Sequence, residues 1–148
     1  MDLNIIQERM IEKIGFLSLH PYHKRRDTNE LTDKELALVS HDDTEPLTKY
    51  YSVRLNNKPA GFVGYTEKLG RKWLQVAINP NFRGLRLAGR AENELMRKEG
   101  IKKAWAAIKS DNYSSIRAHL KNGFRFMTKE ERKVNPVSNG LVLVKETV

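Results

Sequence analysis

Three arginines lie on a short loop between an apolar segment and a run of residues with helical spacing. The loop carries Arg83, Arg86 and Arg90, and the small residues Gly84 and Gly89 accompany them. The first N–H groups of a helix have no partner within the helix and carry the positive end of its dipole. Together with arginine side chains, such N–H groups suit a phosphate or pyrophosphate group. The alternative for this stretch alone is an ordinary basic loop before an amphipathic helix.

The segments on either side of this loop predict the elements that position it. Residues 73–78 are mostly apolar, with β-branched residues near their end, which is typical of a buried strand. Pro80 ends that strand because proline has no N–H for the ladder. Residues 88–99 have helical spacing, with Gly100 as the natural residue after the helix. Residues 104–108 predict the next strand, and we expect it to run parallel to the first because a helix connects the two.

The rest of the chain predicts a single α+β domain. We expect a strand at 51–55, a turn at 56–59, and strands at 60–66 and 72–78 that a turn at 69–71 joins. A later helix is expected from Asp111 or Asn112 to Asn122, and Gly123 ends it. A closing strand pair follows at 124–127 and 141–145, with a loop at 134–140 between the two strands. This order is an antiparallel meander, a βαβ-like unit, another helix and a final strand pair.

The first third of the chain predicts helices and loops. An amphipathic helix is expected over 3–14, a second helix with a capping box over 32–39, and an acidic connector at 41–46. Residues 16–19 either begin a short edge strand or continue a turn. His20 and His23 could contact a metal, but Pro21 breaks the helix that would align them and a third ligand is missing, so we expect no metal.

Composition limits the classes of protein. The 148 residues fit one domain, and the net charge is +9. Residues 1–50 hold 7 Lys/Arg and 10 Asp/Glu, whereas residues 51–148 hold 20 and 8, a balance that suits a polyanionic cofactor or a nucleic acid. The chain has no cysteine, which excludes disulfides and a cysteine acyl-enzyme. Without a signal-peptide pattern or an apolar run of ~20 residues, we expect no membrane contact and a cytoplasmic monomer or homodimer.

Two sequence motifs follow one another in about the middle third of the chain. They are Arg83-Gly84-Leu85-Arg86-Leu87-Ala88 and Asn112-x-x-Ser115-Ile116-x-x-His119-x-x-x-Gly123-Phe124. The first resembles the acetyl-CoA signature of the GNAT family of N-acetyltransferases, Gln/Arg-x-x-Gly-x-Gly/Ala. The second is similar to the family's Asn-x-x-Ala-x-x-Leu-Tyr-x-x-x-Gly-Phe. Two positions depart from these patterns, because Arg86 replaces the central glycine and His119 replaces the tyrosine.

The resemblance implies an acyl-CoA N-acyltransferase-like mixed sheet in three layers, with acetyl-CoA as co-substrate and no metal. In the family, the loop after the fourth strand wraps the pyrophosphate, and pantetheine runs between that strand and the next. The cofactor-binding positions implied here are Val76, Ala77, Ile78, Arg83, Gly84, Leu85, Arg86, Leu87, Ala88, Gly89, Asn112 and Ser115. Arg86 either supplies charge in place of the glycine backbone or points to the adenosine 3′-phosphate. Asn112 either contacts pantetheine or caps its helix.

Acetyl transfer from a thioester requires an amine that has lost its proton and a thiolate that is stabilised or protonated. The family often uses its tyrosine for the second task. His119 stands at that position and can donate a proton near neutral pH, or it packs on a helix face. Glu67 is the only acid between residues 46 and 91 and is a candidate base, unless it is exposed in the turn beside Lys68. Many relatives resemble one another in using a water chain with no dedicated carboxylate.

These observations predict an N-acetyltransferase that moves an acetyl group from acetyl-CoA directly to an acceptor amine. Small amines, proteins and aminoacyl-RNA remain open as acceptors. Residues 1–50 are expected to form the acceptor side, and residues 51–148 the sheet and the acetyl-CoA core. The alternative is a catalytically weak protein of the same fold that binds nucleic acid or another anionic partner through its basic face.

Overall fold

The computed structural model describes residues 15–21, 48–84, 86–133 and 140–147. The expected helices at 3–14 and 32–39, the acidic connector, His23, Leu85 and most of the loop 134–140 lie outside the described residues.

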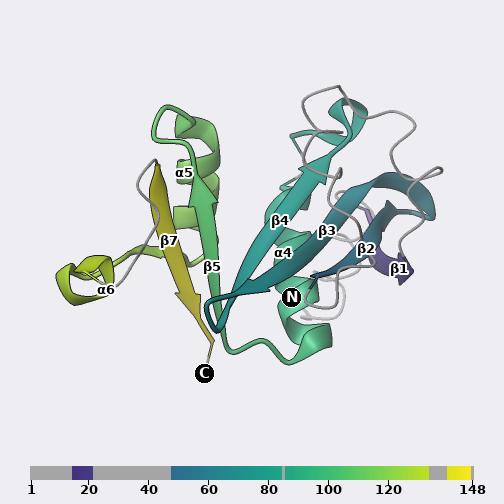
Figure 1. Ribbon diagram of the computed structural model, residues 1–148. Coiled ribbons are helices and arrows are strands. Elements are labelled where there is room, and N and C mark those ends of the chain that lie inside the picture. Colours follow the sequence, from purple (N-terminus) through teal and green to yellow (C-terminus); the bar gives the residue numbers. More distant parts are fainter. Residues whose placement is uncertain (1–14, 22–47, 85, 134–139, 148) are drawn as a thin grey trace, which may run out of the picture.

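One mixed sheet organises the described part of the chain (Figure 1). Its strands lie in the order β1-β2-β3-β4-β5-β7-β6. Their bounds are β1 Leu17–Pro21, β2 Thr48–Leu55, β3 Lys58–Lys68, β4 Arg71–Ile78, β5 Lys103–Ile108, β6 Arg125–Phe126 and β7 Leu141–Glu146. The neighbours β4 and β5 are parallel, as predicted, and the other neighbouring pairs are antiparallel. Of the two alternatives for residues 16–19, the edge strand is confirmed.

Local sequence explains the hairpin that begins the meander. Leu55 pairs with Lys58, so the connection has only two residues, Asn56 and Asn57. Both asparagines have positive φ, at 50° and 65°. This conformation matches the twist of the strands, and asparagine tolerates it better than most residues do. The first strand therefore ends at Leu55 as predicted, and the second strand begins at Lys58, two residues earlier than predicted.

The two parallel strands diverge from one another. Their ladder has a single register pair, Trp73 with Trp105, near the start of β4. The indole rings of this pair contact each other with centroids 6.4 Å apart. Beyond it, β4 and β5 separate toward their C-terminal ends, as Figure 1 shows. The last residues of β4 therefore pair with β3 on one side only.

The helices η1 (Pro80–Phe82), α4 (Leu87–Glu99), α5 (Tyr113–Lys121) and α6 (Lys129–Lys133) connect the strands. Apolar residues of α4 and α5 share one core cluster with β2, β3, β4, β5 and β7, so both helices cover the same face of the sheet. Fully buried side chains such as Leu95 of α4 and Leu143 of β7 anchor this core. The helix α4 ends as predicted, with Gly100 in a left-handed conformation at φ 64°.

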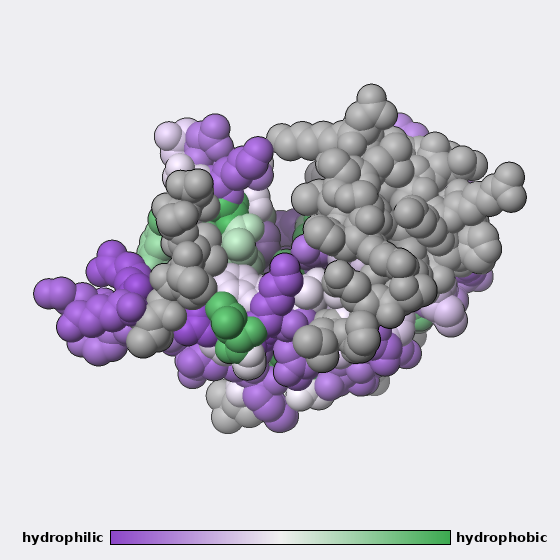
Figure 2. Space-filling view, viewed as in Figure 1, coloured by the Kyte–Doolittle hydropathy of each residue, from purple (hydrophilic) through white to green (hydrophobic). Residues whose placement is uncertain are grey.

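The C-terminal part contains the predicted closing strand pair and one further element. The strands β6 and β7 pair antiparallel, and β7 lies between β5 and β6 in the sheet. A short helix, α6, follows β6 and was not predicted. Thr128 and Glu131 cap it reciprocally, through bonds of 2.8 Å and 3.2 Å between side-chain oxygens and backbone N–H groups. No residue of α6 is buried, and its surface is hydrophilic in Figure 2.

Candidate functional site

The N-terminus of α4 is open. Its cap position is Arg86, which makes no side-chain capping bond, and the first turn carries no acid. The N–H of Arg90 makes the first bond of the helix, 3.2 Å from the carbonyl of Arg86. The preceding N–H groups of Leu87, Ala88 and Gly89 therefore have no partner within the helix and carry the positive end of its dipole.

The backbone of Arg86 is left-handed, with φ 55° and ψ 28°. This conformation is strained for any residue with a Cβ and free of strain for glycine. The family pattern has glycine at this position. The loop thus follows a path suited to glycine while carrying an arginine, so the backbone geometry and the additional charge are both present.

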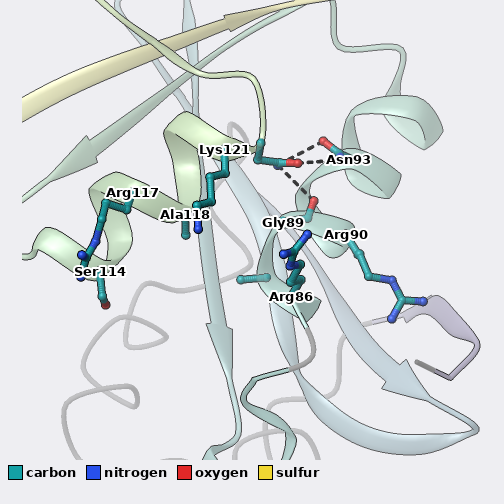
Figure 3. A pocket seen from close by; sticks show the side chains of 10 residues that line it. Arg86, Gly89, Arg90, Asn93, Ser114, Arg117, Ala118 and Lys121 are labelled. Carbon is teal, nitrogen blue, oxygen red and sulfur yellow. Dashed lines mark hydrogen bonds between the residues drawn. The ribbon is translucent and has the colours of Figure 1, made fainter. Parts of the chain in front are cut away.

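A pocket of about 500 Å³ opens beside this helix end. Figure 3 shows it between the start of α4 and one face of α5. Its lining residues are Arg86, Ala88, Gly89, Arg90, Asn93, Ser114, Arg117, Ala118, Lys121 and Asn122. The size lies within the usual range for small-molecule sites, roughly 300–1,000 Å³.

The pocket is positively charged, and no carboxylate lines it. Arg86, Arg117 and Lys121 are exposed and have no hydrogen-bond or ion-pair partner among the described residues. Arg90 differs from them, because its Nη2 donates to the carbonyl of Gly15 at 2.8 Å and burial lowers the pKa of its guanidinium. Figure 3 shows Arg90 turned away from the pocket. Three unpaired cations beside an open helix end favour an anionic ligand.

Helical spacing explains why α5 presents these groups together. Ser114, Arg117 and Lys121 are three and four residues apart, so they share one face of the helix. Asn112 begins this helix, and its side-chain oxygen accepts a bond of 3.3 Å from the N–H of Ser115. Of the two roles considered for Asn112, the cap is therefore observed, and contact with a ligand stays a prediction.

The diverging end of β4 lies just before the loop. Ala77 and Ile78 are buried and Val76 is partly buried, so their side chains belong to the core and only main-chain groups could meet a ligand. Arg83 turns back toward this strand end, with its Nε donating to the carbonyl of Ile78 at 3.3 Å. The predicted loop and strand end are thus adjacent. Leu87 likewise has a buried side chain and offers only its backbone.

His119 lies between α5 and α4, on the buried side of α5. Its Nε2 is 3.2 Å from Oε2 of Glu92, and its Nδ1 is 2.8 Å from the carbonyl oxygen of Ser115. The edge of Phe124 packs against its ring. Burial lowers the pKa of His119, but the hydrogen bond and charge of Glu92 and the carbonyl of Ser115 outweigh it, so the pKa is raised. The packing alternative is therefore observed, and an acid role stays a prediction.

Glu67 lies far from these groups. It pairs with Lys72 beside the turn between β3 and β4, whereas the loop follows Ile78, which pairs with Gly61 at the other end of the ladder. Six residue steps along a strand correspond to roughly 20 Å. The structure does not bring Glu67 together with His119 or the pocket, and its role as a base stays a prediction.

Sequence reasoning missed the α5 side of the pocket. It selected Ser115, which contacts His119, whereas the neighbouring Ser114 lines the pocket. It also missed Arg117 and Lys121. A signal was available, because these basic residues recur at helical spacing inside the second motif. Their position opposite Arg86 could not be deduced, since nothing in the sequence shows how α4 and α5 face each other.

In the described ranges no three His, Asp or Glu side chains are grouped closely enough to hold a metal ion. Among the described helices, none has the length and apolar character needed to cross a membrane.

Comparisons with known proteins agree with this geometry. A sequence model described as "Acetyltransferase (GNAT) family" matches residues 16–124. A search of curated protein sequences found no match. An acetyltransferase from Thermus thermophilus is similar in structure, with a TM-score of 0.64 at 16% identity over 90% of this chain and 99% of its own.

Two similar structures were solved with a ligand named. The PaiA N-acetyltransferase of Thermoplasma acidophilum, in complex with coenzyme A, has a TM-score of 0.60 at 10% identity over 89% of this chain and 99% of its own. The N-acetyltransferase PseH of Campylobacter jejuni, in complex with acetyl coenzyme A, has a TM-score of 0.59 at 12% identity over 90% of this chain and 100% of its own. At these identities the similarity concerns the fold.

Proposed function

The chain belongs to the acetyltransferase (GNAT) family, and on this premise we propose that it transfers an acetyl group from acetyl-CoA directly to an acceptor amine. One observation carries the proposal. The open N-terminus of α4 and three cations that have no partner among the described residues meet in one pocket, after the strand that diverges from its parallel neighbour. A ligand with several phosphates and a long flexible arm fits this combination of charge and shape.

Acetyl-CoA would supply the thioester whose acetyl group is transferred. The free N–H groups at Leu87, Ala88 and Gly89 would hold the pyrophosphate together with Arg86, and Arg83 and Gly84 belong to the same loop. Arg117 and Lys121 would hold a further phosphate from the α5 side. Main-chain groups of residues 76–78 have no ladder partner toward β5. They would form hydrogen bonds with the amide groups of the pantetheine arm. Leu85, Asn112 and Ser115 remain candidate contacts.

The chain's contribution to the transfer itself is mainly to position and orient. Holding an amine and a thioester together can supply much of the acceleration. His119 is the proposed proton donor to the leaving thiolate, but both its ring nitrogens already contact acceptors. A His119→Gln variant whose turnover falls more than its acetyl-CoA affinity would support the acid role. Equal losses in both would restrict His119 to packing. Glu67 remains a candidate base, and a Glu67→Gln variant can be compared in turnover and affinity in the same way.

The acceptor is an amine of a class that remains open. We propose that residues 1–50 form much of its binding side and that residues 51–148 carry the donor site. The sheet already begins within the first of these segments, because β1 pairs with β2.

The test combines donor binding with an acceptor screen. Acetyl-CoA is titrated calorimetrically into wild type and Arg117→Ala at two salt concentrations, with Arg132→Ala on α6 as the charge-matched control. We expect affinity to fall only in Arg117→Ala. Release of free thiol is then followed with polyamines, amino acids, N-terminal peptides and aminoacyl-RNA. Donor binding without transfer to any amine class would oppose the enzyme proposal.

The second candidate function is binding of nucleic acid through the basic face. It is favoured by the charge of residues 51–148, which carry 20 Lys/Arg against 8 Asp/Glu. Such binding weakens steeply with salt, because phosphate contacts release counterions. RNA that binds at low salt and is lost at moderate salt, with no acetyl-CoA binding at either, would favour this candidate.

A further inference from the structure

Beneath the pocket, a buried pair of charged groups joins its two helices. Glu92 of α4 is only 2% exposed, and His119 of α5 is 9% exposed. Oε2 of Glu92 lies 3.2 Å from Nε2 of His119. Neither side chain lines the pocket, but each is close in sequence to residues that do. Glu92 is therefore a buried carboxylate that takes no part in the donor site proposed above.

The two oxygens closest to the His119 ring nitrogens are acceptors, and the Ser115 hydroxyl lies farther away, 3.4 Å from Nδ1. One nitrogen faces the Glu92 carboxylate and the other faces the carbonyl oxygen of Ser115, at 2.8 Å. A neutral imidazole has one N–H and one lone pair, whereas the protonated ring has two N–H donors. Only protonated His119 donates to both of these oxygens. A neutral ring that donates to Glu92 would place the Nδ1 lone pair against the closer carbonyl oxygen, with only the Ser115 hydroxyl at 3.4 Å as a donor, which is less favourable.

Close contacts next to the pair make the helix spacing sensitive to it. A Cβ at Gly89 of α4 would lie 3.1 Å from the side chain of Asn122, which follows α5. Asn122 bonds the carbonyl of Gly89 at 3.2 Å and the side chain of Asn93 at 2.9 Å. Lys145 of β7 donates to Asn93 at 2.6 Å and to the carbonyl of Asn122 at 2.7 Å. A small movement of α5 would therefore disturb the pocket floor.

We propose that Glu92 and His119 are positioning residues of the donor pocket, which hold Arg117 and Lys121 of α5 at the distance from Arg86 at which one polyphosphate ligand contacts all three. This inference rests on the proposed function, since it concerns the same pocket. It adds a role for Glu92 and a pH dependence that packing alone would not produce.

The sign of the pH dependence follows from the charges around His119. Glu92 faces it from α4, and Lys145 of β7 interacts electrostatically with this carboxylate, while burial lowers the pKa of Lys145. Because the pKa of His119 is raised in the folded protein, the stabilisation by its protonated form is complete below about 6.5. It is lost as pH rises through the folded-state pKa. Donor affinity should therefore fall as pH rises above about 6.5 and through the folded-state pKa of His119.

The experiment measures acetyl-CoA affinity by calorimetry from pH 6.5 to 9 in wild type, Glu92→Gln and His119→Gln. Acetyl-CoA is the probe because its thiol is blocked and its phosphates are fully ionised across most of this range, with a second phosphate pKa of about 6. Glu94→Gln is the matched control, since Glu94 lies on the same helix and pairs with Arg97 at the surface. The His119 ring protons are followed by NMR in the same buffers.

We expect wild-type affinity to fall about fivefold or more along the NMR titration of His119, the lower end of usual couplings between linked sites. His119→Gln should show weaker binding with no such slope, and Glu94→Gln should match wild type. Wild-type binding that is independent of pH while His119 titrates would overturn the inference and leave the proposed function intact. Absence of acetyl-CoA binding in wild type at every pH would overturn both. If Glu92→Gln does not fold, the wild-type slope and His119→Gln still decide.

Discussion

A comparison of Arg86→Gly with Arg86→Ala separates two properties that this residue combines. Its backbone is left-handed, at φ 55° and ψ 28°, and its exposed guanidinium lines the pocket. Arg86→Gly removes the strain and the charge together. Arg86→Ala removes the charge alone, because alanine has the same Cβ penalty in this conformation.

The magnitude follows from backbone energetics. A left-handed conformation costs a residue with a Cβ roughly 1–2 kcal/mol. Glycine loses about 0.5–1 kcal/mol more conformational free energy on folding than alanine does, which offsets part of the gain. We therefore expect Arg86→Gly to stabilise the folded state by about 0.5–1 kcal/mol. For a domain of this size, 1 kcal/mol corresponds to about 2–4 °C in Tm.

Urea denaturation of wild type, Arg86→Gly and Arg86→Ala measures these free energies of unfolding, and acetyl-CoA titration measures the affinity of each. We expect Arg86→Gly to be more stable than Arg86→Ala, and both variants to bind acetyl-CoA more weakly than wild type. Charge-assisted hydrogen bonds contribute about 1.5–3 kcal/mol, so the loss should reach roughly tenfold or more. Equal or lower stability of Arg86→Gly than of Arg86→Ala would refute the argument from strain. Unchanged affinity in both would remove the guanidinium from the donor site.

Three further predictions concern charge. Lys121→Ala should weaken acetyl-CoA binding, most strongly at low salt, whereas Arg132→Ala on α6 should not; calorimetry at two salt concentrations compares them. Ala88→Glu places a carboxylate at the open N-terminus of α4 and should therefore abolish donor binding. The same carboxylate should stabilise the helix by about 0.3–1 kcal/mol through its interaction with the helix dipole. A loss of stability in this variant would contradict the dipole argument. Hydrogen bonds from Arg125 lower the pKa of Glu131 to about 2, so this pair stabilises the fold above pH 4.5 and loses that effect between 4.5 and 2. Arg125→Ala should therefore flatten stability over that interval in acid denaturation, and an unchanged acid profile would disprove the assignment.

The sequence predicted the elements whose signals are local. Asn112 capped α5 and Gly100 ended α4, because capping depends on side chains and backbone conformations within a few residues. The parallel neighbours β4 and β5 also followed from local order, since a helix connects them. The short helix α6 was missed although Thr128 and Glu131 form a capping box, because five residues are too few to show a periodic pattern.

The site was predictable only in part for the same reason. The loop at Arg83, Arg86 and Gly89 is continuous in the chain, and its motif identified it. The partners of His119 are not continuous with it: Glu92 lies 27 residues away, on another helix. No motif linked the two, so His119 could be placed in the second segment without knowing that it faces a buried carboxylate.

By itself, the sequence determined a positively charged loop at the start of a helix, because residue types, helix dipole and turn chemistry act over a few residues. The tertiary structure alone decided which groups face that loop. It brought Arg117 and Lys121 of α5 opposite Arg86, buried His119 on Glu92, and left Glu67 at the far end of a ladder. It also inserted β7 between β5 and β6. These pairings depend on how apolar faces of separate elements pack into one core, and that packing is a property of the whole chain.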